Sequence, residues 1–396
     1  QYYLNSNMYS SELQRALVKQ MNDSKRNDER IDWRVNEQDN TPMYQHFKGL
    51  SLYSSIFHHN ILDDYYDDLK INMAEESLSR YQSTNGRQNI ASLFSIRYVM
   101  LKEYQHNIPS FFKKVKSAGQ YSIYENALNL PSVKVTNHIY DSKSLKTPID
   151  REHAMLDGVV LNNKGTNYKQ KAKNLLNQVD ISSQNIVKSN KHHIKVTQSS
   201  GKVKLHLPKS LQKRYTDFYL TMKIKRGLPD SNYTVGINQY SNNRLYNDSV
   251  YRIGVDTQLY RTQPDKNGDI TIQLSPKGTF DFQLLNLNGE NYDKLKKAHE
   301  NANFNLKYHD IKNGVKVNLD KHSKGIATIN IPYRSGMKAF VDGEQENVYK
   351  ANGMMTAVPV EKNAKTIVIK YQPPLWNTMI FVSILSIIIS LSLIHI

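Results

Sequence analysis

The stretch LWNTMIFVSILSIIISLSLIHI, residues 375–396, decides the architecture of this chain because it contains no formally charged side chain. An α-helix of this length spans about 33 Å, which is enough to cross the hydrocarbon core of a bilayer. Pro373 and Pro374 precede it, and Trp376 suits the headgroup boundary. A buried helix of a soluble protein is the alternative, but this length and apolarity favour a membrane anchor. The rest of the chain is then expected on one side of the membrane.

The composition predicts two soluble domains and an anionic partner. The 396 residues carry a formal net charge of +17 and contain no cysteine. This length exceeds one compact core, and without cysteine these residues hold no disulfide, thiolate zinc site or cysteine nucleophile. The positive charge favours nucleic acid, phospholipid headgroups or an anionic wall polymer. A membrane tether makes nucleic acid the least expected of these, so we predict no nucleic-acid partner.

Residues 1–161 mix helical and strand patterns and predict an α+β domain. Apolar residues recur at helical spacing over 9–21, and residues 30–36 alternate as a strand. Residues 87–103 predict a short helix followed by a buried strand, and 147–161 a helix that a threonine caps and a proline begins. The opening QYYLNSNMYS lacks a signal-peptide pattern, so we expect the chain to be part of a longer membrane protein.

The second half of the chain predicts a linker followed by a β-sandwich. Residues 162–204 contain nine lysines and one acidic residue, a composition typical of a solvated basic linker. From 205 to 374, short alternating runs are separated by turns such as KNG, VDG and ANG, which predicts a mainly antiparallel β-sandwich. Only residues 290–302 interrupt it, as an amphipathic helix. The last strand then leads into the transmembrane helix at 375–396.

Four aspartates form a first candidate site. Asp63 and Asp64 are followed at i+4 by Asp67 and Asp68, so a helix would stack them in two pairs, as a hard cation prefers. The alternative is a solvated first turn whose carboxylates complement the helix dipole. No glycine turn or further oxygen ligand accompanies these residues, which favours the second interpretation. We therefore predict no metal site and identify no cofactor, and the sequence leaves the metal requirement of the whole protein open.

Several stretches resemble one family in the same order. IPYRSGMKAFVDGEQENVYKANGMMTAVPVEKNAKTIVIKYQPP (331–374), followed by an apolar helix, resembles the end of the bacterial YfhO family of multi-spanning membrane proteins. GLSLYSSIF (49–57) resembles its Ser/Tyr-rich segment, RQNIASLFSIRYVMLKE (87–103) its short helix and tyrosine strand, and YSIYENALNLPSVKV (121–135) its hairpin. The matches spread over most of residues 45–375.

The resemblance implies a hexosyl or N-acetylhexosaminyl transferase of the GT-C type. Such an enzyme would take a sugar from an undecaprenyl-phosphate donor and glycosylate lipoteichoic acid or another anionic envelope polymer. The parent is then a multi-pass protein of the cell membrane, with these soluble domains on the extracytoplasmic face. Enzymes of this class usually carry their catalytic carboxylate in an early loop between the first spans. No catalytic residue is therefore expected in this chain, which should be inactive by itself.

The predicted substrate contacts follow from the chemistry of glycosyl transfer. A base must deprotonate the acceptor hydroxyl, and donors must stabilise the leaving phosphate. Arginine suits the second role because its forked guanidinium matches phosphate oxygens. We place this contact where arginines bracket a polar stretch near the Ser/Tyr-rich segment. The predicted substrate-binding residues are Tyr53, Ser54, Ser55, Arg80, Arg87 and Arg97. The alternative for each of them is an ordinary place in a strand or a capping turn.

Two other function classes remain open on the sequence. A non-catalytic, membrane-anchored module could bind anionic wall polymer or carbohydrate through the β-sandwich. A cytoplasmic regulator tethered to the membrane is the third class, and the lack of a nucleotide or kinase motif in these residues disfavours it.

Overall fold

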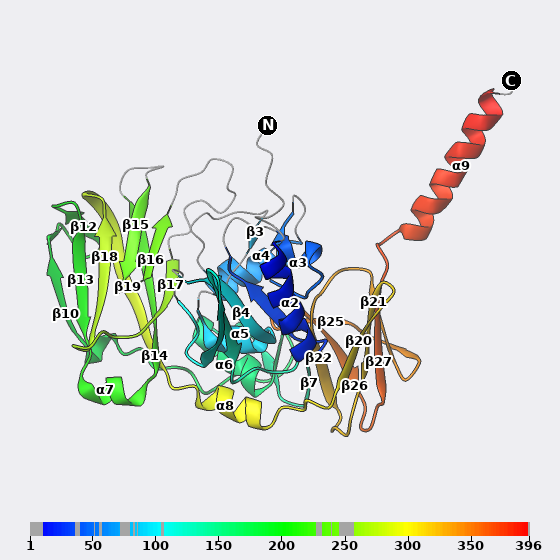
Figure 1. Cartoon of the computed structure of the whole chain (residues 1–396), viewed down its shortest axis with the longest axis horizontal. Helices are drawn as coiled ribbons and strands as arrows, with labels where there is room; N and C mark the ends of the chain where they lie inside the picture. Colours follow the sequence, from blue (N-terminus) through cyan, green and yellow to red (C-terminus); the bar gives the residue numbers. More distant parts are fainter. Residues whose placement is uncertain are drawn as a thin grey trace.

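The computed structural model arranges the chain as a central mixed region between two β-sandwiches, with one helix projecting from the body (Figure 1). We call the sandwich formed by residues 180–290 sandwich 1. Sandwich 2 combines residues 307–371 with strands from 133–161. The structure describes residues 11–35, 40–50, 52–54, 58–71, 80–81, 84, 86–103, 107–226, 232–238, 240–244 and 257–394.

The N-terminal part of the central region is a four-stranded sheet with one long helix. The elements are α2 (Glu12–Ser24) and, in spatial order, β1 (Arg30–Trp33), β4 (Ile96–Lys102), β6 (Tyr121–Asn126) and β5 (Phe112–Ala118). Strand β1 runs parallel to β4, and the other neighbours are antiparallel. The buried face of α2 packs through Leu17 and Met21 into one cluster with Trp33. The predicted helix and strands are confirmed here, because each depends on local apolar spacing.

Short helices fill the middle of the central region. They are α3 (Thr41–Tyr44), α4 (His59–Leu62), the π-helix η1 (Asp63–Asp68), α5 (Gln88–Leu93) and α6 (Pro148–Asp157), beside the strand pair β2 (Leu52–Tyr53) and β3 (Arg80–Tyr81). Helix α6 starts as predicted, since the Thr147 hydroxyl accepts from Asp150 N at 3.2 Å and Pro148 occupies the first turn. Tyr65, Ile90 and other apolar side chains form the core between these helices and the sheet.

Sandwich 2 takes strands from both ends of the chain. One sheet has the order β7 (Val133–Thr136), β22 (Gly325–Pro332), β26 (Met355–Val360), β25 (Tyr349–Ala351), β9 (Val159–Leu161) and β8 (Ile139–Asp141). The other has the order β20 (Lys307–Ile311), β21 (Gly314–Asn318), β27 (Thr366–Tyr371), β23 (Met337–Val341) and β24 (Glu344–Glu346). Because Val133 of β7 pairs with Ile329 of β22, the fold does not divide at residue 161 as predicted. This pairing is non-local and leaves no mark on either strand's own sequence.

Sandwich 1 consists of two five-stranded antiparallel sheets. The first has the order β10 (Asp180–Gln184), β13 (Gly201–His206), β18 (Asp269–Ser275), β15 (Tyr233–Ile237) and β16 (Tyr240–Arg244). The second has the order β11 (Ile186–Lys188), β12 (His193–Val196), β19 (Gly278–Glu290), β14 (Asp217–Arg226) and β17 (Thr257–Thr262). The remaining elements of the body are helices α7 (Lys209–Arg214) and α8 (Asp293–Glu300) and the 3₁₀ turns Ser142–Ser144 and Leu176–Gln178.

The stretch 162–204 is not a linker, because four strands of sandwich 1 lie within or begin in it. In β13 the buried residues Val203 and Leu205 alternate with exposed lysines, and in β12 Ile194 and Val196 are buried in the same way. Successive side chains of a strand point to opposite faces, so the lysines of these strands face solvent while the apolar residues between them face the core. The number of lysines therefore indicates a solvated segment, although every second residue of β12 and β13 belongs to the core.

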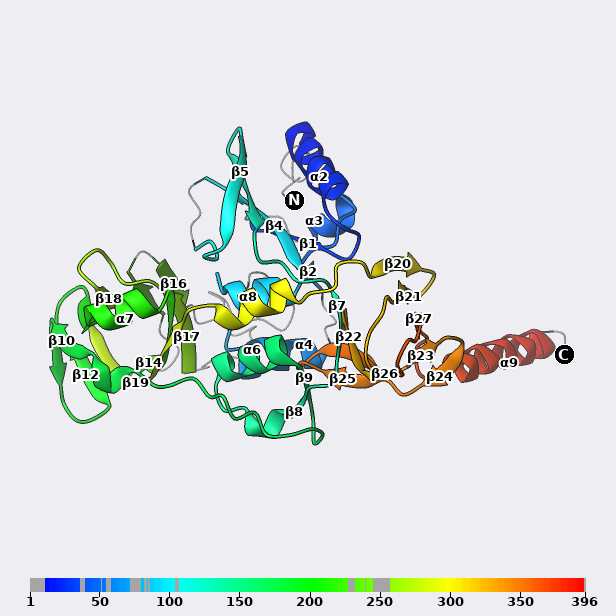
Figure 2. The same ribbon diagram turned by 90° about the horizontal axis from the view of Figure 1, so that it is seen from below.

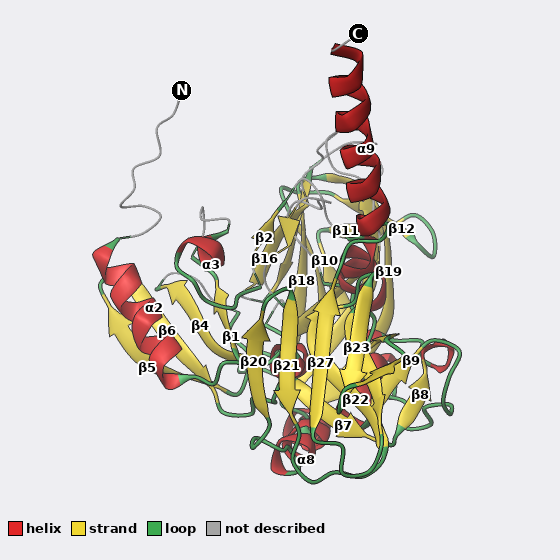
Figure 3. Cartoon of the chain, turned by 90° about the vertical axis from the view of Figure 1, so that its right-hand side faces the viewer, coloured by secondary structure: helices red, strands yellow, loops and turns green. Residues whose placement is uncertain are grey.

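Helix α9 (Trp376–Ile394) confirms the predicted apolar C-terminal helix. Within the described part of the chain it is the one helix long and apolar enough to cross a membrane. None of its apolar window is buried against the body, and Phe381, for example, is 66% exposed. Among the residues that the structure describes, α9 is therefore not a helix of the body's core. Figure 3 shows α9 rising from the end of sandwich 2.

A buried ion pair joins the central helices to sandwich 1. Arg87 at the start of α5 pairs with Glu152 of α6, and the two side chains are 1% and 0% exposed. The other oxygen of Glu152 accepts from the Tyr219 hydroxyl of β14 at 2.8 Å and from Asn89 at 3.1 Å. One carboxylate thus holds α5, α6 and β14 together.

A second buried carboxylate extends this network to β19. Glu290 accepts from Asn89 at 2.8 Å, from His153 at 2.6 Å and from the backbone N of Tyr292 at 2.7 Å. Burial alone would lower the pKa of His153, but the hydrogen bond and charge of Glu290 outweigh it and raise this pKa. The position of α6 against sandwich 1 therefore depends on charge pairing.

We expect Glu152→Gln to destabilise the fold strongly, because it leaves the buried Arg87 charge without a counter-charge. Breaking a buried pair in this way costs about 3–5 kcal/mol of unfolding free energy. Glu361→Gln is the matched control, since Glu361 pairs with Lys324 on the surface with side chains 73% and 71% exposed. That change should cost at most about 1 kcal/mol. Urea unfolding in detergent measures both variants, and equal losses would contradict the role of the buried pair.

Candidate functional site

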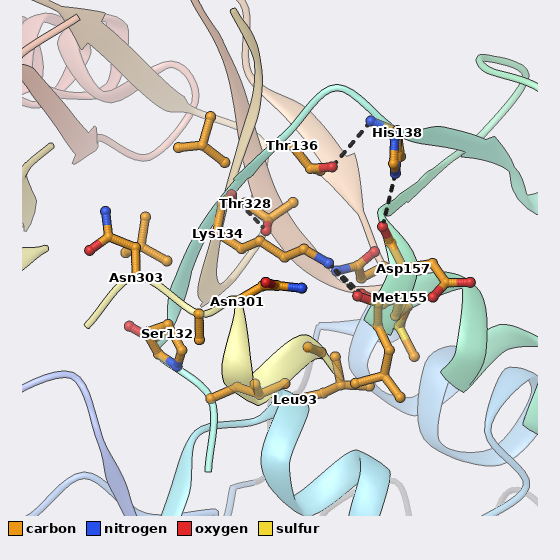
Figure 4. Close-up of a pocket in the computed structure, with 18 of the residues that line it drawn as sticks. Leu93, Ser132, Lys134, Thr136, His138, Met155, Asp157, Asn301, Asn303 and Thr328 are labelled. Atoms are coloured by element: carbon orange, nitrogen blue, oxygen red, sulfur yellow. Dashed lines mark hydrogen bonds between the residues drawn. The ribbon is translucent and has the colours of Figure 1, made fainter. Parts of the chain in front are cut away.

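A pocket of about 720 Å³ lies between α6, α8 and sandwich 2, and we call it the α8 pocket. Its walls are β7, the C-terminal end of α6, α8 with the residues after it, and part of β22. Figure 4 shows side chains from these elements converging on the pocket. A volume of this size falls within the range of about 300–1,000 Å³ typical of small-molecule sites.

Lys134 of β7 forms one wall of the α8 pocket and holds the end of α6. Its ammonium donates to the carbonyl oxygens of Met155 at 3.1 Å, Leu156 at 2.7 Å and Gly158 at 3.1 Å. These carbonyls lack partners within the helix, and a cation there complements the helix dipole. Burial lowers the pKa of Lys134 to about 8, so the side chain still carries its charge at neutral pH. Figure 4 shows this side chain reaching across to Met155.

Asp157 and Lys294 form an ion pair in the wall next to Lys134. Lys294 of α8 lies 2.7 Å from Asp157 of α6 and donates to Gln170 at 2.5 Å. The pair joins α8 to the end of α6. Hydroxyl, amide and ammonium groups surround the remaining space, a set that can bind a polar or anionic ligand.

No local pattern in the sequence marks Ser132, Lys134 or Asp157 as site residues. The α8 pocket is assembled from β7, α6, α8 and β22, which come together through strand pairing in sandwich 2 and through the contacts that Lys134 and Lys294 make with α6. The nearest signal is the lysine inside the otherwise apolar run SVKV, which a strand pattern alone assigns to a solvated face.

The structure brings two of the predicted substrate contacts together. Tyr53 of β2 and Arg80 of β3 occupy directly paired register positions of an antiparallel strand pair. Ser54 follows Tyr53 and is partly buried. Ser55 lies outside the described residues. A sugar or phosphate contact by this segment stays a prediction.

The other two predicted arginines are engaged in ion pairs elsewhere. Arg87 belongs to the buried pair with Glu152. Arg97 of β4 pairs with Glu125 of the neighbouring strand β6 and donates to the Asn129 side chain at 3.1 Å. Both guanidinium groups therefore stabilise the scaffold in this structure, and substrate binding by them stays a prediction.

The four aspartates are not brought together as a metal site. Asp64 is 2% exposed, Asp67 is exposed, and Asp68 forms an ion pair with Arg151 at 2.9 Å. Among the described residues no group of three or more His, Asp or Glu side chains is arranged to hold a metal ion. The π-helix η1 replaces the regular turn that the i+4 pairing requires. A solvated first turn does not describe Asp64 either, because its carboxyl group is buried.

The buried Asp64 carboxyl faces a hairpin turn of sandwich 2. Neither of its oxygens has a hydrogen-bond partner among the described residues. A Cβ atom added to Gly353, in the turn between β25 and β26, would lie 1.7 Å from Asp64 Oδ1. Burial, together with the nearby Asp68 charge, raises the pKa of Asp64 to about 8. Asp64 is therefore a neutral acid at pH 7 and packs against the turn as an uncharged group.

We expect Asp64→Asn to change how stability depends on pH. The folded chain keeps the Asp64 proton up to about pH 8, whereas the unfolded chain releases it near the ordinary value of 3.8. The folded state thus binds more protons between these values, and the free energy of unfolding falls by up to about 1.4 kcal/mol per pH unit. The amide of the variant does not titrate, so this loss disappears. Urea unfolding at pH 5 and pH 8 should show the variant gaining on the wild type by a few kcal/mol, and a constant difference would contradict the buried acid.

We expect Gly353→Ala to destabilise the chain more than Gly343→Ala. Both glycines have a left-handed backbone, with φ of +83° and +96°, so both variants carry the same backbone penalty of about 1–2 kcal/mol. Nothing lies within 4 Å of a Cβ at Gly343, whereas at Gly353 it meets Asp64. The difference between the two unfolding free energies therefore measures the contact with Asp64. Equal values would show that the turn does not pack on Asp64.

Comparison with known proteins places the chain among bacterial membrane proteins. Residues 1–383 match the family described as "Bacterial membrane protein YfhO". A protein of Bacillus subtilis (strain 168), named "Uncharacterized protein YfhO", is 31% identical over 98% of this chain, and the match covers 46% of that protein's length. The chain therefore spans about half of the curated relative.

Solved structures show only weak likeness. The arabinofuranosyltransferase AftD from Mycobacteria aligns at 7% identity and a TM-score of 0.16, over 38% of this chain and 12% of that one. The botulinum neurotoxin serotype C1 binding domain aligns at 8% identity and a TM-score of 0.19, over 51% of this chain and 91% of that one. Both scores are too low to indicate a shared fold. On the family match, this chain belongs to the YfhO family of bacterial membrane proteins.

Proposed function

We propose that the chain is the extracytoplasmic part of a multi-spanning GT-C glycosyltransferase of the cell membrane. The reaction moves a hexosyl or N-acetylhexosaminyl group from an undecaprenyl-phosphate donor to lipoteichoic acid or a related anionic envelope polymer. The observation that carries the proposal is that a strongly basic body is fixed to an exposed apolar helix in a family of bacterial membrane proteins. The family resemblance supplies the reaction class.

The connection between the body and α9 supports a position at the membrane surface. Strand β27 ends at Tyr371 and α9 begins at Trp376, so only a short segment with Pro373 and Pro374 separates them. Figure 1 shows α9 leaving on the side of the body where β3 and α4 lie, opposite α7 and α8. If α9 spans the bilayer, the strand pair with Tyr53 and Arg80 faces the membrane.

This orientation fits a lipid-linked donor. The sugar phosphate of such a donor stays at the membrane surface because its lipid is held in the bilayer. Tyr53, Ser54 and Arg80 are then the described part of the predicted set closest to it, and an arginine fork there would bind the phosphate. The base that activates the acceptor belongs to the upstream part of the parent protein. The chain on its own is therefore proposed to be inactive.

The second candidate function is binding of an anionic polymer or carbohydrate without chemistry. The α8 pocket favours it, because the polar residues that line it all belong to this chain. Helix α8, which forms one wall, lies on the side of the body away from α9. In this case the basic body would retain a polymer at the cell surface.

Deletion of the gene for the full-length parent tests the first function. Lipoteichoic acid purified from the deletion strain should lose its glycosyl signals in NMR spectra, because the proposed acceptor is no longer modified. A plasmid with the full-length gene should restore them, and a plasmid without the part that encodes this chain should not. Unchanged glycosyl signals in the deletion strain would exclude this acceptor.

Protease treatment of intact protoplasts tests the proposed side of the membrane. The soluble body should be cleaved without lysis, since it is proposed to lie outside the cell. Protection until lysis would place it in the cytoplasm and contradict both candidate functions.

A further inference from the structure

We propose that the α8 pocket binds a phosphodiester-linked polyol repeat of an anionic envelope polymer. It would do so on the face of the body turned away from α9. The inference rests on the proposed function only for the choice of polymer. The charges, the unpaired polar groups and the position of the pocket carry the ligand chemistry.

The charge of the pocket favours a phosphate-bearing ligand. Lys134 and Lys294 are part of its walls, and Lys297 and Lys321 line it as exposed side chains. Within the described part of the chain, neither Lys297 nor Lys321 has a hydrogen-bond or ion-pair partner for its ammonium group. The two lining acids, Asp157 and Asp293, lie within 4 Å of Lys294 and Lys296 respectively. Two lysines thus remain for a phosphodiester.

An unpartnered buried hydroxyl in the pocket wall also points to a ligand. Ser132 is 4% exposed and lines the pocket, yet its Oγ has no hydrogen-bond partner among the described residues. Buried polar atoms in folded proteins are nearly always hydrogen-bonded. A ligand hydroxyl or phosphate oxygen would supply the missing partner.

The remaining lining fits a polyol. Asn301 and Asn303 line the pocket just after α8, and an amide side chain can donate to and accept from ligand hydroxyls. Leu93, Met155 and Leu156 supply apolar surface beside them, against which the CH groups of a polyol chain can pack. Figure 4 shows Asn301 beside the Lys134 side chain within the pocket.

The position of the pocket separates it from the membrane. Figure 2, seen from below, shows α6 and α8 on the side facing the viewer, while Figure 1 shows α9 rising from the opposite side. A lipid headgroup in the membrane that α9 would enter does not reach this face. A polymer anchored in that membrane can reach it, because its chain extends outward for many repeats. The pocket would therefore hold the polymer at a distance from its anchor.

The test measures binding of poly(glycerol phosphate) oligomers, prepared from deacylated lipoteichoic acid without sugar substituents, to the full chain in an uncharged detergent. Titration calorimetry should show saturable binding that weakens with salt. The double variant Lys297→Gln/Lys321→Gln should bind about tenfold more weakly or worse, because two charge-assisted contacts are lost. Asn301→Trp should do the same by filling the pocket from an exposed position. Near-ultraviolet circular dichroism verifies that each variant keeps its fold.

The matched control is Lys312→Gln/Lys316→Gln, which removes two exposed lysines outside the pocket. Its affinity should stay within about twofold of the wild type, since neither lysine lines the pocket and salt screens exposed charges that do not contact the ligand. Equal losses in the control and the pocket variants would show general surface attraction and overturn the proposal. Wild-type affinity in both pocket variants would overturn it too.

Two further ligands test the chemical class. Uncharged maltooligosaccharides should bind at least about tenfold more weakly than the phosphate oligomers, because Lys297 and Lys321 gain nothing from them. Phosphatidylglycerol vesicles should bind the wild type and the pocket variants equally, since the pocket faces away from α9. Equal binding of the neutral sugar, or vesicle binding that the pocket variants abolish, would contradict the assigned ligand.

The binding measurements and the deletion experiment distinguish a failure of the pocket proposal from a failure of the proposed transferase function. Loss of oligomer binding in the pocket variants together with unchanged glycosylation in the deletion strain would remove the transferase and keep the pocket. Glycosylation lost on deletion, with pocket variants that bind normally, would remove the pocket and keep the transferase.

Discussion

The buried charge of Arg87 is the constraint on which the rest of this structure depends. A guanidinium that is 1% exposed requires a counter-charge, and Glu152 supplies it from the middle of α6. The same carboxylate accepts from Tyr219 of β14, so it fastens sandwich 1 to the helix. Glu290 repeats the arrangement from β19 through His153. The centre of helix α6 is thereby held by buried charge pairs, and breaking them would lower the free energy of unfolding.

The α8 pocket is built on the far end of that helix. The terminal carbonyls of α6 receive Lys134 from β7, and β7 pairs with β22 of sandwich 2. Asn330 of β22 donates to Leu93 O at 2.6 Å and to Ser95 Oγ at 2.8 Å. These bonds connect sandwich 2 to the end of helix α5 in the central region. Hydrogen bonds and charge pairs, many of them buried, therefore set the pocket walls, and such walls are preorganised for a ligand.

The body has two surfaces that the proposed function assigns to different ligands. The strand pair β2 and β3 lies on the side from which α9 projects, and α8 lies on the other side (Figure 1). Helix α8 contributes residues to the wall of the α8 pocket. A lipid-linked donor is confined to the membrane surface, whereas an envelope polymer extends from it. If one face of the body binds the donor and the other binds the polymer, the body would bring the polymer to the membrane. The two ligands would then not need to share one cavity. Under the proposed function, the excess positive charge of the chain would raise the local concentration of the polyanion near the body.

The sequence by itself determined the features that depend on neighbouring residues. The apolar length of α9, the threonine cap of α6 and the alternation in strands such as β13 of sandwich 1 and β21 of sandwich 2 each follow from a few adjacent positions. Only the tertiary structure decided that the lysine-rich stretch 162–204 contributes strands, that Arg87 is buried against Glu152, and that Ser132 and Asn301 share a pocket. The physical reason is that burial and pairing belong to contacts between distant segments. A charged side chain has the same local sequence pattern whether it faces solvent, a counter-charge or a ligand.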